Sequence, residues 1–168
     1  AAKQISLSKL GSIRLDKDET KKMVTTIPRS SIIGFIVGVL PGAGSTIASF
    51  LAYGMERNFV KDEEKQKFGK GSVNGLSAPE TANNAACSGS FVPLLTLGIP
   101  GSGTTAVMLG ALLGFGIQPG PRLYQTNPEI FWSVIMSMYI GMVILLILNL
   151  PLIPCLLYTS DAADDRVS

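Results

Sequence analysis

The 168-residue sequence has no histidine, two cysteines and several long stretches without charge. Without histidine it lacks the commonest metal ligand and the usual general base, so neither a metal site nor a nucleophile–base pair is predicted. Cys87 and Cys155 have neither the C-x-x-C spacing of a zinc site nor the pattern of a disulfide framework. A net charge of +2, without a basic stripe interleaved with aromatic residues, argues against nucleic-acid binding. We therefore expect neither an enzyme nor a cofactor.

Charged residues are absent from residues 30–55, 81–121 and 130–160. A soluble helix needs a polar face, whereas a membrane span needs about 20 predominantly apolar residues. The sequence therefore predicts an all-α integral membrane protein, a polytopic helix bundle with broken or re-entrant helices. The chain starts without methionine and with a polar, basic segment, which indicates an internal fragment of a longer membrane protein.

The charge pattern also predicts the order of the segments. Basic residues flank the first apolar run on both sides, so the positive-inside rule places both flanks in the cytoplasm and the later connector outside. The first run would then enter and return as a hairpin that turns at Pro41-Gly42; a single kinked spanning helix is the alternative. The tail becomes abruptly polar, and we interpret this change as a sequencing or assembly artefact. The segments are a polar basic cytoplasmic flank (1–29), a first broken helix or hairpin (30–56), a polar loop (57–80), a second broken helical segment (81–121) interrupted at Pro93 and at Pro100-Gly101, a connector (122–129), a transmembrane helix (130–157) and an atypical tail (158–168).

A seven-residue motif occurs twice, as an internal repeat with a spacing of 59 residues. In each copy proline ends the incoming helix, and Gly-x-Gly allows a tight turn that leaves backbone N–H groups uncovered. Serine or threonine then stands where an N-cap belongs. The two copies are Leu40-Pro41-Gly42-Ala43-Gly44-Ser45-Thr46 and Ile99-Pro100-Gly101-Ser102-Gly103-Thr104-Thr105.

Paired breaks of this kind are typical of a transporter binding site, because unpaired backbone is tolerated at membrane depth only where it lines a polar cavity. Half-helix N-termini favour anions such as carboxylates. We expect the two loops to meet near the bilayer midplane and to hold the substrate together; simple kinks in two separate helices are the alternative. The predicted substrate-binding residues are Gly42, Ala43, Gly44, Ser45 and Thr46 in the first copy and Gly101, Ser102, Gly103, Thr104 and Thr105 in the second.

Two further patterns carry predictions. Ser77 and Glu80 have the spacing of a capping box and predict a helix start. Asn83 and Asn84 follow on the same face as Glu80, so these three residues form a tentative cation site of hard oxygen ligands. Alternatively, Glu80 only caps the helix and the asparagines bond neighbouring helices. Small residues spaced for helix packing in membranes are Gly34, Gly38, Gly110 and Gly114.

Several long motifs in order closely resemble the large membrane subunit of the tripartite tricarboxylate transporters, the TctA family. The resemblance covers about residues 20–153 and does not include the tail. The motifs that carry it are Pro41-Gly42-Ala43-Gly44-Ser45-Thr46-Ile47-Ala48-Ser49-Phe50, Phe68-Gly69-Lys70-Gly71, Ala78-Pro79-Glu80-Thr81-Ala82-Asn83-Asn84-Ala85, the stretch from Pro93 to Val107, and Gly116-Ile117-Gln118-Pro119-Gly120-Pro121.

The resemblance implies a multi-pass protein of the bacterial inner (plasma) membrane, embedded in lipid. It implies cation-coupled secondary transport of citrate-like tricarboxylates or related carboxylates by alternating access, with Na⁺ or a proton as coupling ion. The implied partners are a small membrane subunit and a periplasmic substrate-binding protein. A channel with the broken helices as pore filter is the alternative, although two unequal copies in one chain favour a carrier. Family members are much longer, so this chain is not expected to transport alone.

Overall fold

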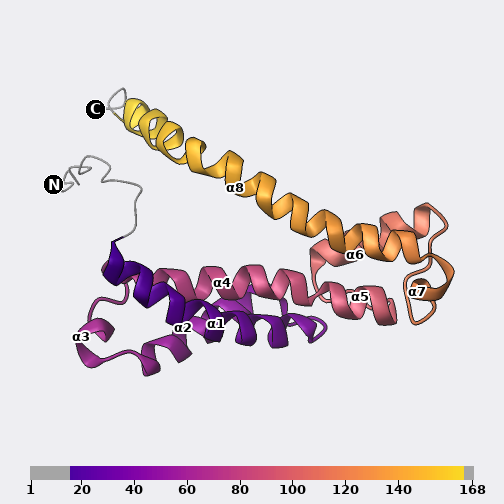
Figure 1. Cartoon of the computed structure of the whole chain (residues 1–168), viewed down its shortest axis with the longest axis horizontal. Helices are drawn as coiled ribbons and strands as arrows, with labels where there is room; N and C mark the ends of the chain where they lie inside the picture. Colours follow the sequence, from indigo (N-terminus) through magenta and orange to yellow (C-terminus); the bar gives the residue numbers. More distant parts are fainter. Residues whose placement is uncertain (1–15, 165–168) are drawn as a thin grey trace. The chain divides into compact units, whose positions relative to one another are not determined.

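The computed structural model describes the backbone of residues 16–164 and the side chains of residues 16–153 and 155. This part of the chain is all-helical and contains no strand, as predicted (Figure 1). It falls into two compact units, residues 16–127 and residues 128–164. Residues 1–15 of the basic flank and 165–168 of the tail lie outside the described residues. The helices are α1 (Lys17–Val39), α2 (Gly44–Phe59), α3 (Asp62–Lys65), α4 (Val73–Gly89), α5 (Phe91–Leu97), α6 (Gly103–Gly114), α7 (Leu123–Thr126) and α8 (Pro128–Asp164).

Helix α1 begins inside the predicted polar flank rather than near residue 30. A capping box explains this start: the Asp16 carboxylate accepts from the backbone N–H of Lys17 at 2.7 Å, and the Asp16 N–H donates to the Glu19 carboxylate at 3.0 Å. The helix is also fixed by packing, because Thr26 and Ser30 on its inner face are buried. Much of the predicted flank is therefore part of the packed helical unit.

Helices α1 and α2 form a hairpin whose turn occupies residues 40–43. Two glycines in or beside the turn have left-handed backbone conformations, Gly42 with φ of 82° and Gly44 with φ of 71°. At the open end of the hairpin, Thr26 of α1 donates to Glu56 of α2 at 2.8 Å. The chain thus folds back on itself instead of forming one kinked helix. The position of this hairpin relative to a membrane stays a prediction.

The core of this unit is built from small residues on α1, α2 and α4, which pack against one another (Figure 1). A Cβ atom on Gly34 would lie 2.3 Å from the carbonyl oxygen of Ala82, and one on Gly38 would lie 2.3 Å from that of Ala86. Both glycines are therefore required by the close approach of α1 to α4, which confirms the predicted packing role. Gly110 and Gly114 have no such neighbour among the described residues.

Large apolar side chains lie on the outside of the same unit. Ile36, Phe50 and Val107 are exposed, while the interior holds alanine, glycine and several polar groups. This distribution is the reverse of a soluble domain, in which large apolar side chains fill the core. It suits helices that meet lipid or further apolar helices.

Helix α4 does not begin at the predicted capping box of Ser77 and Glu80. It begins at Val73, where the Ser72 hydroxyl accepts from the backbone N–H of Gly75 at 3.1 Å. The prediction is wrong because Ser72 supplies a cap earlier in the chain and Pro79 is accommodated inside the helix. The carbonyl group of Pro79 then accepts a hydrogen bond from Ser49 of α2 at 3.1 Å.

The interruptions of residues 81–121 are at Ser90 and at residues 98–102. Pro93 was expected to mark the first break, but it lies in the first turn of α5. Proline is tolerated there because an N–H at that position has no acceptor within the helix. The second break lies where the sequence predicts it. It starts at Gly98, whose left-handed conformation, with φ of 70°, ends α5.

Helix α8 contains the single stretch among the described residues that is both long and apolar enough to cross a membrane, Pro128–Ile153. It matches the predicted transmembrane segment 130–157 closely in position. Helix α6 is also apolar but shorter, with 12 residues, and α1 and α2 carry polar ends. A membrane-length helix is therefore present, and a polytopic bundle stays a prediction.

Candidate functional site

The two copies of the repeated motif touch each other. The backbone N–H of Gly42 in the first copy donates to the carbonyl oxygen of Gly101 in the second at 3.2 Å. Gly101 fits closely against the rest of the unit, since a Cβ atom there would lie 3.0 Å from the Cβ of Ser90. The structure therefore brings together two loops that the sequence separates by 59 residues.

Each copy starts a helix at the same position of the motif. Helix α2 begins at Gly44 and α6 begins at Gly103, the second glycine of Pro-Gly-x-Gly in both cases. The caps differ. Ser102 accepts from the backbone N–H of Thr105 at 3.3 Å, whereas the equivalent Ala43 has no side chain that can cap α2.

The N-cap was predicted at the serine or threonine that follows Gly-x-Gly, and this prediction is wrong in both copies. In the second copy the cap is Ser102, between the two glycines, while Thr104 and Thr105 lie in the first turn of α6. In the first copy, Ser45 and Thr46 lie within the first turn of α2, two and three positions after the cap position at Ala43. The first N–H groups of α2 have no capping side chain, so they are left for another acceptor.

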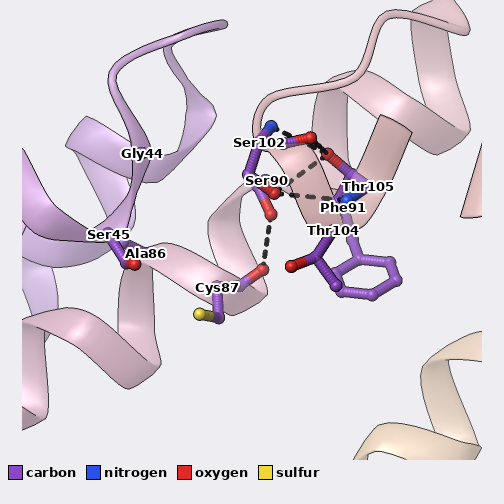
Figure 2. Close-up of a pocket in the computed structure, with 9 residues that line it drawn as sticks. All are labelled: Gly44, Ser45, Ala86, Cys87, Ser90, Phe91, Ser102, Thr104 and Thr105. Carbon is purple, nitrogen blue, oxygen red and sulfur yellow. Dashed lines mark hydrogen bonds between the residues drawn. The ribbon is translucent and has the colours of Figure 1, made fainter. Parts of the chain in front are cut away.

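A cavity of about 80 Å³ lies between the starts of α2 and α6 (Figure 2). It has room for a few water molecules or one carboxylate group. Five predicted substrate-binding residues line it, while the other five lie around it in the loops and first turns. The lining residues are Gly44, Ser45, Ala86, Cys87, Ser90, Phe91, Ser102, Thr104 and Thr105; the predicted residues outside the lining are Gly42, Ala43, Thr46, Gly101 and Gly103.

The polar groups of this cavity are hydroxyls and helix N-termini, no charged side chain lines it, and the greater part of its surface is apolar. Ser45 from α2 and Thr104 from α6 appear on either side of Cys87 in Figure 2. The Thr105 hydroxyl is occupied by Ser102, whose N–H donates to it at 2.8 Å, and the Ser90 hydroxyl donates to the carbonyl of Cys87 at 2.8 Å. The positive ends of two helix dipoles meet here, an arrangement that attracts an anion.

The predicted cation ligands lie on α4 outside the cavity lining. Glu80 and Asn84 are exposed, and the Asn84 amide donates to the backbone carbonyl of Glu80 at 2.9 Å. Asn83 accepts from the thiol of Cys87, which does line the cavity, at a sulfur–oxygen distance of 3.7 Å. Within the described residues no group of three His, Cys, Asp or Glu side chains is placed to hold a metal ion. A cation site at these residues stays a prediction.

Comparison with known proteins places this geometry in a family. The model of the tripartite tricarboxylate transporter TctA family matches residues 1–164. The chain belongs to the TctA family. This confirms the resemblance, and the family is one of transporter subunits rather than of enzymes. The match also includes residues 158–164, which the sequence motifs alone set apart as an atypical tail.

Two curated relatives from Agrobacterium vitis support the TctA assignment. The chain is 43% identical over 151 residues to an uncharacterized 52.8 kDa protein in the TAR-I ttuC′ 3′ region, covering 90% of this chain and 30% of that protein. It is 49% identical over 120 residues to an uncharacterized protein in the TAR-II ttuC′ 3′ region, covering 71% of this chain and 49% of that protein. The chain thus spans less than half the length of either relative. No solved structure matches it.

The structure of this TctA chain also shows a buried polar cluster that sequence reasoning missed. Glu56 is 2% exposed and accepts from Thr26 at 2.8 Å, from Arg29 at 2.8 Å and from Asn74 at 3.2 Å. The cluster joins α1, α2 and α4 at the open end of the hairpin. A signal was available: a hairpin that turns at residues 40–43 places residues 26–29 opposite residues 54–57.

Proposed function

We propose that this chain supplies part of the substrate site of a cation-coupled secondary transporter for citrate-like tricarboxylates or related carboxylates. The observation that carries the proposal is the cavity shared by the two Pro-Gly-x-Gly loops, which are joined by the Gly42–Gly101 hydrogen bond. The complete protein would work by alternating access in the bacterial inner membrane. Its expected partners are a small membrane subunit and a periplasmic substrate-binding protein.

The physical case for a carboxylate rests on the donors that surround the cavity. The first turn of α2 has free backbone N–H groups, and Ser45 and Thr104 add hydroxyls at the two helix starts. A carboxylate accepts from such donors and is favoured by both helix dipoles. One carboxylate group fills a cavity of about 80 Å³, so the rest of the substrate would extend into parts of the site formed by the longer protein.

The coupling ion would bind near this cavity and bring the net charge of the loaded site closer to neutral. Asn83 is the best-placed of the predicted ligands, because it contacts Cys87 in the cavity wall. We expect Na⁺ or a proton as coupling ion. In the full-length protein, N83A and N84A should raise the cation concentration that gives half-maximal uptake; an unchanged dependence in both variants would assign them a structural role.

The direct experiment measures uptake by the full-length protein in proteoliposomes with S45A and T104V. Both substitutions remove a hydroxyl at the cavity, and T104V keeps the side-chain shape. The matched control is T96V, on the exposed Thr96 of α5, whose hydroxyl bonds only its own helix, at 2.6 Å from the carbonyl of Val92. Loss of a hydrogen bond to a charged group is worth about 1.5–3 kcal/mol, or roughly 10-fold or more in affinity.

We expect S45A and T104V to raise the half-saturating substrate concentration, and T96V to leave it unchanged. Equal behaviour of all three variants would contradict the proposal. A counterflow assay separates a carrier from a channel, because exchange of labelled for unlabelled substrate requires a carrier. Absence of counterflow together with passive flux would favour the pore.

A further inference from the structure

A second polar hollow lies in the segment between α6 and α7, at a motif that the loop cavity does not use. It is an open hollow with a volume of about 470 Å³, and it shares no lining residue with the loop cavity. Its wall combines a guanidinium, two amide side chains and a hydroxyl with glycine backbone. The residues that matter are Gly116, Gln118, Gly120, Arg122, Thr126 and Asn127.

This hollow is held in place by α5 rather than formed by a loose loop. The backbone N–H of Gly120 donates to the carbonyl of Leu95 at 3.3 Å. Gly98 at the end of α5 lies against Pro119 so closely that a Cβ atom would come within 2.7 Å of its carbonyl oxygen. Leu123, just past the hollow, is 1% exposed and anchors the other end. The backbone of the wall is therefore held in place, which limits the ordering that a ligand would have to impose, while the side chains of Gln118 and Arg122 are exposed.

The hollow contains a positively charged side chain in a part of the sequence that has few basic residues. Arg122 is the sole lysine or arginine between Lys70 and Arg166. Among the described residues its guanidinium has no ion pair or hydrogen bond with another side chain, although its backbone carbonyl accepts from Thr126 at 3.0 Å. A single cationic side chain without a partner in the described part of the chain, at a concave surface in a stretch poor in basic residues, is suited to an anionic ligand.

We propose that this hollow is a capture site for a substrate carboxylate, separate from the loop cavity. Arg122 would bind the carboxylate through two parallel N–H···O bonds, with Gln118 adding an amide donor. The positive-inside rule predicts that the segment 122–129 lies outside, on the side from which substrate arrives. The proposal rests on the proposed function for the identity of the anion, but on different residues.

The test is uptake by the full-length protein in proteoliposomes made of zwitterionic lipid, with R122Q and R122K. The probe is whichever of radiolabelled citrate, succinate and acetate the unaltered protein takes up fastest. R57Q is the matched control, because Arg57 is an exposed arginine on α2 outside both cavities. We expect R122Q to raise the half-saturating concentration about tenfold with little change in maximal rate, R122K to recover part of the loss, and R57Q to have no effect.

Two results would overturn the capture site. One is an unchanged half-saturating concentration in R122Q, or the same shift in R57Q. The other is an effect of R122Q that appears only when anionic lipid is added, since the ligand would then be a lipid headgroup phosphate. Failure of S45A and T104V to alter uptake would count against the loop cavity alone, so the two proposals fail separately. If none of the three acids is taken up, the proposed function and the capture site are both wrong about the substrate.

Discussion

Gly42 donates its backbone N–H to the carbonyl oxygen of Gly101 at 3.2 Å, so the two copies of the repeat are in direct contact. The contact favours glycine at both ends: Gly42 has a positive φ of 82°, and a Cβ atom on Gly101 would be tightly packed, 3.0 Å from the Cβ of Ser90. This hydrogen bond joins the loops that precede α2 and α6, and the starts of both helices line one cavity. The repeat therefore pairs two helix N-termini. Its two copies differ in their N-caps, because Ser102 caps α6 and no side chain caps α2.

The caps of the two helices should respond differently to substitution. S102A removes the side-chain acceptor at the start of α6 and should lower the free energy of unfolding by about 1 kcal/mol. A43S should give no comparable gain at the start of α2, because Ala43 has helical backbone angles, φ −67° and ψ −44°, rather than the extended ones of an N-cap. Thermal unfolding in detergent measures both. A gain from A43S equal to the loss from S102A would show that the two starts are equivalent.

The approach of α1 to α4 should depend on Gly34 and Gly38. G34A and G38A each put a Cβ atom 2.3 Å from a backbone oxygen, so the helices must separate, and we expect a loss of about 2 kcal/mol or more in unfolding free energy. G54A is the control, because a Cβ atom there has no neighbour within 4 Å. Alanine favours helix, so G54A should be neutral or stabilising by up to about 1 kcal/mol. Equal melting temperatures for the three variants would refute the packing.

The buried Glu56 cluster should contribute far more to the free energy of unfolding than an exposed ion pair does. E56Q leaves Arg29 without its partner, and because Arg29 is 40% exposed we expect a loss of roughly 2 kcal/mol rather than the 3–5 typical of deeper pairs. The control D62N removes a pair whose carboxylate is 92% exposed, and should change stability by less than about 0.5 kcal/mol. In a cycle with R29M, the two losses should be less than additive. Additive losses would mean that Arg29 and Glu56 do not stabilise each other.

The polar segment after α2 should make stability depend on acid pH. The Lys22 ammonium, 3.0 Å from the Glu64 carboxylate, lowers the pKa of Glu64 below its ordinary value of 4.5, and hydrogen bonds from Ser72 and Lys67 act in the same direction. A lowered folded-state pKa means that this stabilisation is present above pH 4.5 and is lost as the pH falls through the folded-state pKa. Melting temperatures of E64Q should therefore fall less steeply below pH 4.5 than those of the unaltered chain. Parallel curves would show that Glu64 does not contribute.

Local sequence signals predicted the parts of this fold that depend on local chemistry. The long runs without charged residues predicted an all-helical fold. The Pro-Gly-x-Gly motifs predicted the turn at residues 40–43 and the break before α6. Errors arose where two local signals competed. Ser72 caps α4 before Ser77 is reached, and Pro93 fits the first turn of α5 instead of ending a helix.

Tertiary features were harder to read from the sequence. The repeat predicted that the two loops meet, because two equivalent helix starts suggest a shared ligand, but it did not predict the hydrogen bond between Gly42 and Gly101. The cluster around Glu56 was missed because it requires the register of the hairpin and of α4, which no single segment encodes. Glu80, Asn83 and Asn84 share a helix but make local hydrogen bonds, so spacing alone does not establish a site there.

The central claim, that both loops face one substrate cavity, is tested most directly by the reactivity of Cys87, which is exposed and lines that cavity. In the full-length protein with Cys87 as its only cysteine, a small thiosulfonate reagent should label the thiol. A carboxylate that the protein transports should slow this labelling several-fold, with half-protection near its half-saturating concentration. A cysteine introduced at Thr96, outside the cavity, should not be protected. Unchanged labelling of Cys87 at saturating substrate would contradict the claim.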